Sequence, residues 1–462
     1  MTDLRDQLFY QPKNGYDRID TEERLALENY CKGYMSFLNV CRTEREAVAW
    51  TVASAEELGF KPYVPGMALK PGDKIYQSNR GKALTMAVIG EQPLSEGCVI
   101  AGAHVDSPRL DLKQSPLYES DELAYFKTHY YGGIKKYQWT VTPLELHGVV
   151  ALKSGETVDV VIGREPGEPR FVITDLLIHL AADQMKKTLA EGIPGEGLNI
   201  LIGSTPYADE GSDRVKLAIM SLLNDRYDIT EEDFLSAELT AVPAFDVCEI
   251  GLDRSMVGGY GHDDRVCAYA ALSALFDMEK PVRTCVCLLV DKEEIGSEGV
   301  TGMQSEAFDT FMADLCEGQG VALRRCYEKS LCLSTDVTAA FDPNFPEAFE
   351  KRNSSRLNYG VGLAKHTGVR GKGGSNDASA ELVARMRAAL DEDKVVWHMA
   401  ELGKVDQGGG GTIAKFMAKR NIDTIDAGVP VLSMHAPFEV VSKLDCYMTY
   451  KAVHAAYKVK EE

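Results

Sequence analysis

The chain has 462 residues, 45% of them hydrophobic, which is enough apolar material to bury the cores of two domains. Asp and Glu (70) outnumber Lys and Arg (50), and the net charge of −20 argues against nucleic acid or an anionic membrane surface as a partner. Eleven scattered cysteines without a Cys-x-x-Cys motif, and the absence of a signal peptide or a long apolar run, predict a soluble protein of the reducing cytoplasm.

The first hundred residues predict helices followed by strands. Residues 21–60 carry helical periodicity and end at glycine and proline. Two strands are expected in ALTMAVIG (83–90) and CVIAGA (98–103), and the second runs directly into His104.

The pattern changes between residues 108 and 245. An aromatic-rich stretch, THYYGGIKKYQW, is followed by the strand-like runs HGVVAL and TVDVVIG and by connections rich in Pro and Gly. We therefore predict that 108–245 is an inserted, mostly β domain, and that 1–107 and 246–462 together form a second domain.

The remainder returns to alternating strands and helices. Asp263 and Asp264 precede an Ala-rich amphipathic helix within 258–278, a further helix is expected near 378–390, and strand-like runs lie in 330–344 and 428–440. This alternation predicts an α/β domain with a mainly parallel sheet.

The stretch TCVCLLVDKEEIGSEG (284–299) combines an apolar strand with two adjacent carboxylates. Residues 285–290 are uninterruptedly apolar, as in a strand buried on both faces of a sheet. Glu293 and Glu294 follow at its carboxyl end, where two ionised groups are costly unless a cation neutralises one of them. A metal ion is one explanation; two solvated loop residues are the other.

Several strands share this design, in which an apolar run is followed by a side chain that binds metals. The residues that follow such runs are His104, Glu293, Glu294, Asp336 and His435. If the strands are parallel neighbours, these side chains meet at one edge of one sheet. Asp263 and Asp264 stand before a helix, where a carboxylate can be a ligand or a helix cap.

The set of imidazole and carboxylate groups contains no thiolate. It suits a catalytic zinc site, with cobalt or manganese as alternatives. Five ligands plus a further glutamate predict two divalent ions about 3.5–4 Å apart that share a carboxylate and a water.

Five ordered segments closely resemble the motifs of one family. The segments are AGAHVDSPRLD, HDDRVCA, DKEEIGSEG, STDVTAAFDPN and SMHAPFE. They are similar to the aspartyl aminopeptidase/aminopeptidase I family of di-zinc metallopeptidases, and the similarity extends over nearly the whole chain. The resemblance implies a catalytic α/β domain, with a central mixed, mainly parallel sheet flanked by helices, interrupted by an inserted, mostly β dimerisation and substrate-access domain. It also implies homodimers assembled into a dodecamer.

The resemblance implies roles for individual residues. One zinc ion is held by His104, Asp263 and Asp336, and the other by Asp263, Glu294 and His435, so that Asp263 bridges the two. Glu293 is the general base.

Further contacts are expected around these ligands. Asp106 resembles the carboxylate that orients a ligand imidazole, although it could instead form a turn before Pro108. His179 matches a family histidine that contacts substrate or metal in a neighbouring subunit's pocket; a core or surface histidine is the alternative. Lys365, His366 and Ser375, in a loop we expect near the pocket, are candidate substrate contacts.

One departure bears on specificity. Where the eukaryotic branch has a histidine-bearing stretch after the ligand Asp, residues 337–342 here read VTAAFD. The chain therefore resembles the bacterial aminopeptidase I type, and a preference for acidic N-terminal residues is not expected.

The predicted activity is that of a metal-dependent aminopeptidase acting on peptides with a free N-terminus. A hydroxide bridging the metal ions attacks the peptide carbonyl, and Glu293 accepts the proton. Two alternatives are another di-metal hydrolase, such as a carboxypeptidase or deacylase, and an inactive metal-binding, self-assembling scaffold.

Overall fold

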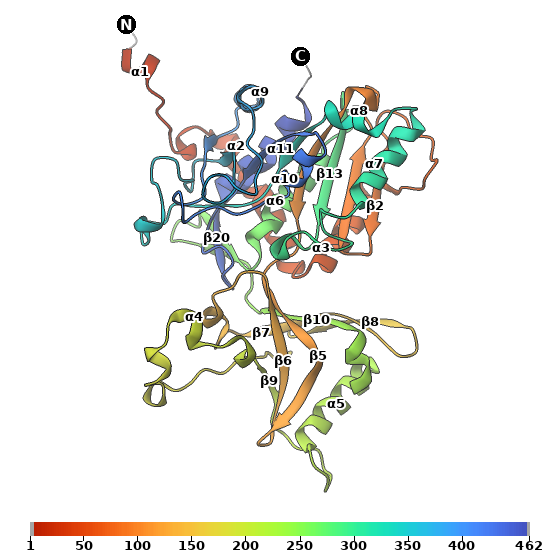
Figure 1. Ribbon diagram of the computed structural model, residues 1–462, viewed down its shortest axis with the longest axis vertical. Coiled ribbons are helices and arrows are strands. Elements are labelled where there is room, and N and C mark those ends of the chain that lie inside the picture. The colour runs from red at the N-terminus through yellow and green to blue at the C-terminus, as the bar shows by residue number, and fades with distance from the viewer. Residues whose placement is uncertain (1–3, 460–462) are drawn as a thin grey trace. The chain divides into compact units, whose positions relative to one another are not determined.

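The computed structural model of the protein describes residues 4–459, which form two compact units (Figure 1). The larger unit comprises the chain up to Asp106, Val247–Met434 and the chain from Glu439. The smaller unit comprises Ser107–Asp246 and His435–Phe438. The stretch expected to be inserted, 108–245, lies within the smaller unit, whereas the assignment of His435–Phe438 to that unit was not foreseen.

A nine-stranded mixed sheet forms the centre of the larger unit. In spatial order its strands are β1 (Lys61–Pro62), β2 (Lys74–Asn79), β3 (Ala83–Val88), β13 (Thr284–Val290), β4 (Cys98–His104), β14 (Leu331–Ser334), β18 (Asp423–Gly428), β16 (Val361–Ala364) and β17 (Trp397–Met399). Strand β4 lies between β13 and β14 and is parallel to both. Most neighbouring pairs are parallel, which confirms the predicted mixed, mainly parallel sheet.

Helices cover both faces of this sheet. Every residue of β4 is buried, and alternate side chains face opposite cores: Val99 and Ala101 face one, Cys98 and Ile100 the other. The first core is completed by α2 (Thr21–Val40), α3 (Glu44–Glu57), α6 (His262–Phe276), α9 (Ala380–Glu392) and α11 (Lys443–Tyr457), and the second by α7 (Ala307–Gly318), α8 (Leu323–Glu328) and α10 (Ala414–Lys419).

Helix α1 (Leu4–Leu8) and short 3-10 turns complete the larger unit: η1 (Gly15–Asp17), η2 (Leu94–Glu96), η8 (Glu293–Ile295) and η9 (Pro346–Ala348). Among residues 4–459, none of the helices has both the length and the hydropathy needed to cross a membrane.

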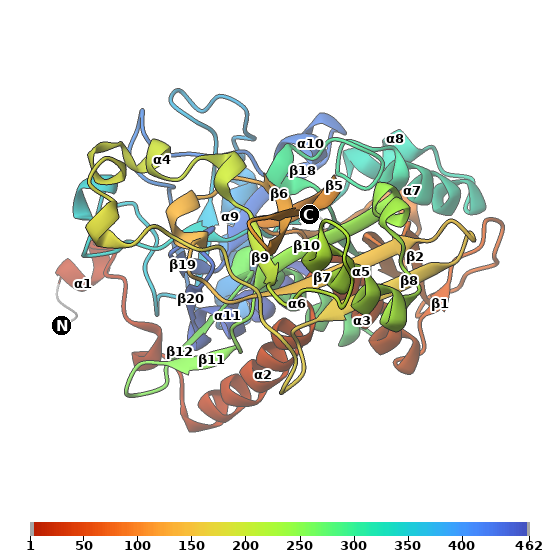
Figure 2. The same cartoon turned by 90° about the horizontal axis from the view of Figure 1, so that it is seen from below.

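A second, five-stranded sheet also belongs to the larger unit, and Figure 2 shows four of its strands, β11, β12, β19 and β20, side by side. Its order is β11 (Cys248–Ile250), β12 (Met256–Gly259), β20 (Glu439–Ser442), β19 (Pro430–Leu432) and β15 (Thr338–Ala339). The prediction that the strand before His435 is a neighbour in the central sheet is therefore wrong. The chain leaves the central sheet after β18, and Pro430, which has no N–H for a ladder, opens the short strand β19 beside β15 and β20.

The smaller unit is built on a six-stranded antiparallel sheet. Its strands in order are β8 (Thr157–Ile162), β7 (Leu144–Ala151), β10 (Ala237–Pro243), β5 (Arg109–Ser120), β6 (Leu123–Tyr131) and β9 (Ile200–Gly203). Its helices and turns are η3 (Lys136–Trp139), η4 (Ile178–Leu180), η5 (Gln184–Lys186), α4 (Leu189–Gly192), η6 (Gly195–Gly197), α5 (Arg214–Tyr227) and η7 (Glu231–Ser236). The mostly β character expected for this region agrees with this sheet.

Candidate metal centre

His104 ends β4 at the carboxyl edge of the central sheet and is only 2% exposed. Its Nδ1–H donates to the backbone carbonyl of Asp106 at 3.0 Å. Its Nε2 then points to Oδ1 of Asp263 at 3.1 Å and to Oδ1 of Asp336 at 3.8 Å. Burial by itself lowers the pKa of His104, but hydrogen bonds with Asp106, Asp263 and Asp336 outweigh burial and raise this pKa well above its usual value. The site therefore stabilises positive charge between the carboxylates.

Asp106 joins the end of β4 to the turn that follows β13. Its Oδ1 accepts the backbone N–H of Glu293 and its Oδ2 accepts that of Glu294, both at 3.2 Å. Its Oδ1 also lies 3.3 Å from Nδ1 of His104. One fully buried carboxylate thus lies against the imidazole and binds the backbone of both glutamates, and its role in orienting a metal ligand stays a prediction.

Asp336 follows β14 in a loop held against β4. The N–H of Thr335 donates to the carbonyl of Gly102 at 2.7 Å, and the Thr335 hydroxyl donates to the same oxygen at 2.9 Å. Because β14 and β4 are parallel neighbours, these bonds hold Asp336 near His104.

Asp263 and Asp264 lie in the first turn of α6 but depart from helical geometry, with φ/ψ of −79°/107° and −116°/26°. Asp264 is fully buried, and its Oδ2 accepts the N–H of His104 at 3.4 Å. Burial, followed by repulsion from Asp336, raises the pKa of Asp264 well above its usual value. From its position in an acidic pair before an apolar helix, Asp264 was expected at the helix start together with Asp263, but the family resemblance gave a role in the metal site to Asp263 alone.

The side chains around His104 form three overlapping groups whose ligand atoms lie within 4.8 Å of one another. The groups are His104 with Glu293 and Asp336, His104 with Asp263 and Glu294, and Asp263 with Asp264 and Asp336. Burial raises the pKa of Glu293 to about 8; repulsion from Asp336 acts in the same direction, whereas attraction by His104 opposes it. So many carboxylates cannot all be ionised at a buried edge unless cations neutralise them, and imidazole with carboxylate is a donor set that zinc accepts. The residues present therefore fit divalent metal ions.

Five of the predicted residues thus meet in the larger unit: His104, Asp263, Glu293, Glu294 and Asp336. Two other predicted histidines, His179 and His435, belong to the smaller unit. The Nδ1–H of His435 donates to the carbonyl of Gly133 at 2.8 Å, so Nε2 is the nitrogen with which His435 would bind a metal ion. His179 lies exposed in turn η4. The functional roles of both histidines stay predictions.

The three candidate substrate contacts lie in the loop after β16. Lys365 forms an ion pair with Asp377, and Nε2 of His366 lies 3.7 Å from Oε1 of Glu401. The Ser375 hydroxyl donates to the carbonyl of the following residue at 2.7 Å. Within residues 4–459, these hydrogen bonds and ion pairs do not reach the five clustered side chains, so contact with substrate stays a prediction.

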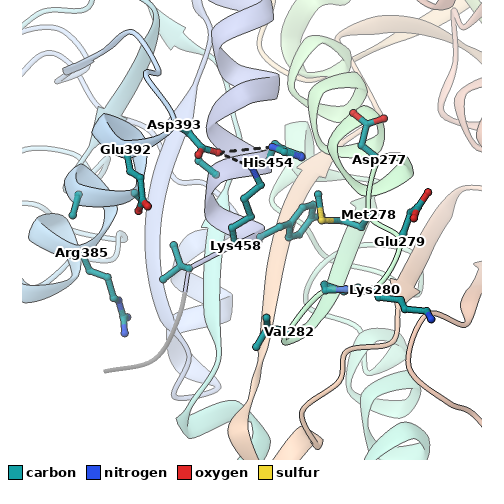
Figure 3. Close-up of a pocket in the computed structure, with 16 residues that line it drawn as sticks. Asp277, Met278, Glu279, Lys280, Val282, Arg385, Glu392, Asp393, His454 and Lys458 are labelled. Atoms are coloured by element: carbon teal, nitrogen blue, oxygen red, sulfur yellow. Dashed lines mark hydrogen bonds and ion pairs between the residues drawn. The ribbon is translucent and has the colours of Figure 1, made fainter.

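A separate cavity of about 680 Å³ opens where α6, α9 and α11 end (Figure 3). On one wall, Asp393 accepts a hydrogen bond from Nζ of Lys458 at 3.0 Å and lies 3.9 Å from Nδ1 of His454. Asp277, at the end of α6, forms part of the lining. Helix α6 has 15 residues, and its two ends are separated by roughly 20 Å. This cavity is therefore distinct from the carboxylate cluster at the start of α6.

Carboxylates and a histidine gathered at the carboxyl edge of a mixed α/β sheet are typical of metal-dependent hydrolases. The family model described as aminopeptidase I zinc metalloprotease (M18) matches residues 37–457, so the chain belongs to this family of zinc aminopeptidases, which hydrolyse peptide bonds. The family expected from the motifs is confirmed.

Individual relatives agree with this assignment. A protein of Clostridium acetobutylicum described as a probable M18 family aminopeptidase 1 is 49% identical over 455 residues, which cover 96% of this chain and 98% of the relative. The crystal structure of an M18-family aminopeptidase from Thermotoga maritima has a TM-score of 0.94 and 42% identity, covering 98% of this chain and 100% of that one. The more distant S. cerevisiae mApe1, solved as a dodecamer, shares the fold with a TM-score of 0.76 at 18% identity, covering 93% of this chain and 96% of that one.

Gly428, the last residue of β18, provides a test of this geometry. A Cβ at this position would lie 1.6 Å from the carbonyl oxygen of Asp336, so Gly428→Ala must displace the backbone that carries Asp336. We expect zinc affinity and turnover to fall by about 10-fold or more, measured by chelator competition and by hydrolysis of an aminoacyl-anilide.

Gly318→Ala is the matched control, because a Cβ at that helical position meets nothing within 4 Å. We expect the control to keep wild-type zinc affinity and turnover. A Gly428→Ala variant that matched it would contradict the placement of Asp336.

Proposed function

We propose that the chain removes N-terminal residues from peptides with two zinc ions and with Glu293 as the general base. The observation that carries the proposal is the cluster of His104 with Asp263, Glu293, Glu294 and Asp336 at one buried sheet edge. The aminopeptidase activity is inferred from family membership, and the cluster supports the roles assigned to individual residues.

The proposed ligands divide into two sets that share Asp263. His104, Asp263 and Asp336 would hold one ion, in keeping with the 3.1 Å and 3.8 Å distances from Nε2 of His104. Asp263 and Glu294 would hold the other, and His435 joins them on the strength of the SMHAPFE motif. When bound, zinc supplies Lewis-acid polarisation of the scissile carbonyl and lowers the pKa of water to about 7.

Glu293 is the proposed base because of its surroundings. Its backbone N–H donates to Asp106, whose backbone carbonyl accepts Nδ1–H of His104, so the backbone of Glu293 is held beside the ligands. A carboxyl group whose pKa is raised by burial toward neutrality can accept a proton from water and return it to the departing amine. Glu294 also has a ligand atom within 4.8 Å of one of His104, and we assign it to metal because the family motif places the ligand second in the pair.

The alternatives considered from the sequence now have less support. A carboxypeptidase or deacylase would use a similar metal pair, but the family model matches aminopeptidases over most of the chain. An inactive scaffold would not need a glutamate beside the ligands with its pKa raised to about 8. Because residues 337–342 lack the histidine of the eukaryotic branch, we propose a preference for neutral N-terminal residues.

We also propose that the chain assembles into homodimers and, through them, a dodecamer. A distantly related structure of the same fold is a dodecamer. The smaller unit exposes a run of large apolar side chains between residues 176 and 189: Leu176, Leu177, Ile178, Leu180, Met185 and Leu189. Exposed apolar patches of this kind mark interaction surfaces, and a second copy of the chain is the proposed partner. His179 lies within the run and would face that neighbour.

The catalytic proposal is tested with Glu293→Gln. The amide cannot accept the proton, so we expect unchanged zinc content and a loss of turnover of about 10²- to 10⁴-fold. Glu298→Gln, which changes an exposed carboxylate in the same loop, should behave as wild type. The assay is an aminoacyl-anilide panel, including leucyl and aspartyl substrates, before and after chelation and metal add-back.

Three results would contradict the proposal. They are full turnover of Glu293→Gln, full turnover of the metal-stripped enzyme, and equal cleavage of N-terminally blocked and unblocked peptides. A preference for the aspartyl substrate would refute the proposed specificity alone.

The assembly proposal is tested with the pair Ile178→Asp and Leu180→Asp. Charges buried in a subunit interface are strongly destabilising, so light scattering should show particles smaller than the wild type. Leu252→Asp, which changes a fully exposed residue of the larger unit, is the control and should keep the wild-type mass. An unchanged mass for the double variant would exclude this surface as the interface.

A further inference from the structure

Glu439 is a buried carboxylate that contacts the backbone of Asp263. It opens β20 and is only 1% exposed. Its Oε2 accepts the N–H of Asp263 at 3.1 Å. In the register of β20 with β12, Glu439 lies opposite Gly259, so the carboxylate lies beside the turn that leads into α6.

The start of α6 needs such a contact from outside the helix. The first N–H groups of a helix have no partner within the helix, and a negative charge is favoured at that end. Asp263 and Asp264 also lack helical backbone angles, so the helix alone does not set the direction of their side chains.

A carboxylate removed from water costs several kcal/mol unless hydrogen bonds compensate. The burial of Glu439 therefore indicates that the backbone N–H of Asp263, which it accepts, has to be held in place. The side chain of Asp264 holds the N–H of His104 at 3.4 Å, so the acidic pair is tied to two different strands, β4 and β20.

We infer that Glu439 is a positioning residue of the metal centre, which holds the backbone of Asp263 and thereby directs the carboxylate shared by the two ions. This inference rests on the proposed role of Asp263 as a ligand. Glu439 lies four residues after His435. One short segment thus carries a proposed ligand, His435, and the residue that positions a second proposed ligand, Asp263.

The test compares Glu439→Gln, Glu439→Asp and Glu439→Leu in the full chain. The glutamine amide oxygen can accept the same N–H, so Gln should keep a zinc affinity close to wild type although it removes the charge. Aspartate keeps the charge but is one methylene shorter, and leucine has no acceptor. Both should weaken zinc binding by about 10- to 100-fold, measured by competition with a chromophoric chelator.

Asp445→Asn is the matched control. Asp445 is also a buried carboxylate that accepts backbone N–H groups, those of Asn358 at 2.8 Å and Gly360 at 2.7 Å. This variant should lower the thermal unfolding temperature of the metal-free protein and leave zinc affinity unchanged, which separates a loss of stability from a loss of ligand positioning.

Wild-type zinc affinity in the Asp and Leu variants would overturn the inference. A Gln variant that binds zinc as weakly as the Leu variant would also overturn it, because zinc affinity would then depend on the charge of Glu439 rather than on its hydrogen bond. If Leu does not fold, the contrast between Gln and Asp decides. Asp263→Ala distinguishes a failure of this inference from a failure of the proposed function. If Asp263→Ala binds zinc as the wild type does, the proposed metal centre is wrong. If Asp263→Ala loses zinc while the Glu439 variants keep wild-type zinc affinity, only the role of Glu439 is refuted.

Discussion

Repulsion among carboxylates at one buried sheet edge is the constraint on which the rest of the site depends. Asp106, Asp263 and Asp264 are buried around His104, and Glu293, Glu294 and Asp336 are half-buried beside them. In such surroundings the carboxyl groups remain ionised only beside positive charge. Burial, together with repulsion from neighbouring carboxylates, raises the pKa of Glu293, and hydrogen bonds with three carboxylates raise the pKa of His104. Divalent cations remove the conflict, which is why the arrangement suits a metallopeptidase.

The fold holds these groups by rigid elements. Parallel pairing of β4 with β13 and β14 brings three strand ends to one place. His104 is the last residue of β4, and the residues after β13 and β14 supply the two glutamates and Asp336. The hydrogen bonds that Asp106 and Asp264 accept from backbone N–H groups then fix the turns relative to the strands. Ligands supported in this way keep their geometry better than ligands on free loops.

The central sheet and part of the site could be predicted because buried parallel strands leave a clear signal. Residues 285–290, before the two glutamates, are uninterruptedly apolar, and the run before His104 adds only one glycine, whereas the shorter run before Asp336 ends in Ser334 and Thr335; parallel neighbours end at the same edge. The position of β19 could not be read in this way, because a strand of three residues that begins with proline has no periodicity to show its partner. Glu439 was missed because its hydrogen bond joins a side chain to a backbone N–H 176 residues away, a contact that no local pattern encodes.

Anomalous diffraction at the zinc absorption edge, from crystals of the zinc-loaded protein, tests most directly whether two zinc ions share the carboxylate of Asp263. Two peaks should appear about 3.5–4 Å apart, with Asp263 oxygens about 2.0–2.2 Å from both and Nε2 of His104 about 2.0–2.1 Å from one. A single peak, or peaks that do not contact Asp263, would contradict a shared carboxylate and with it the organisation of the site described above.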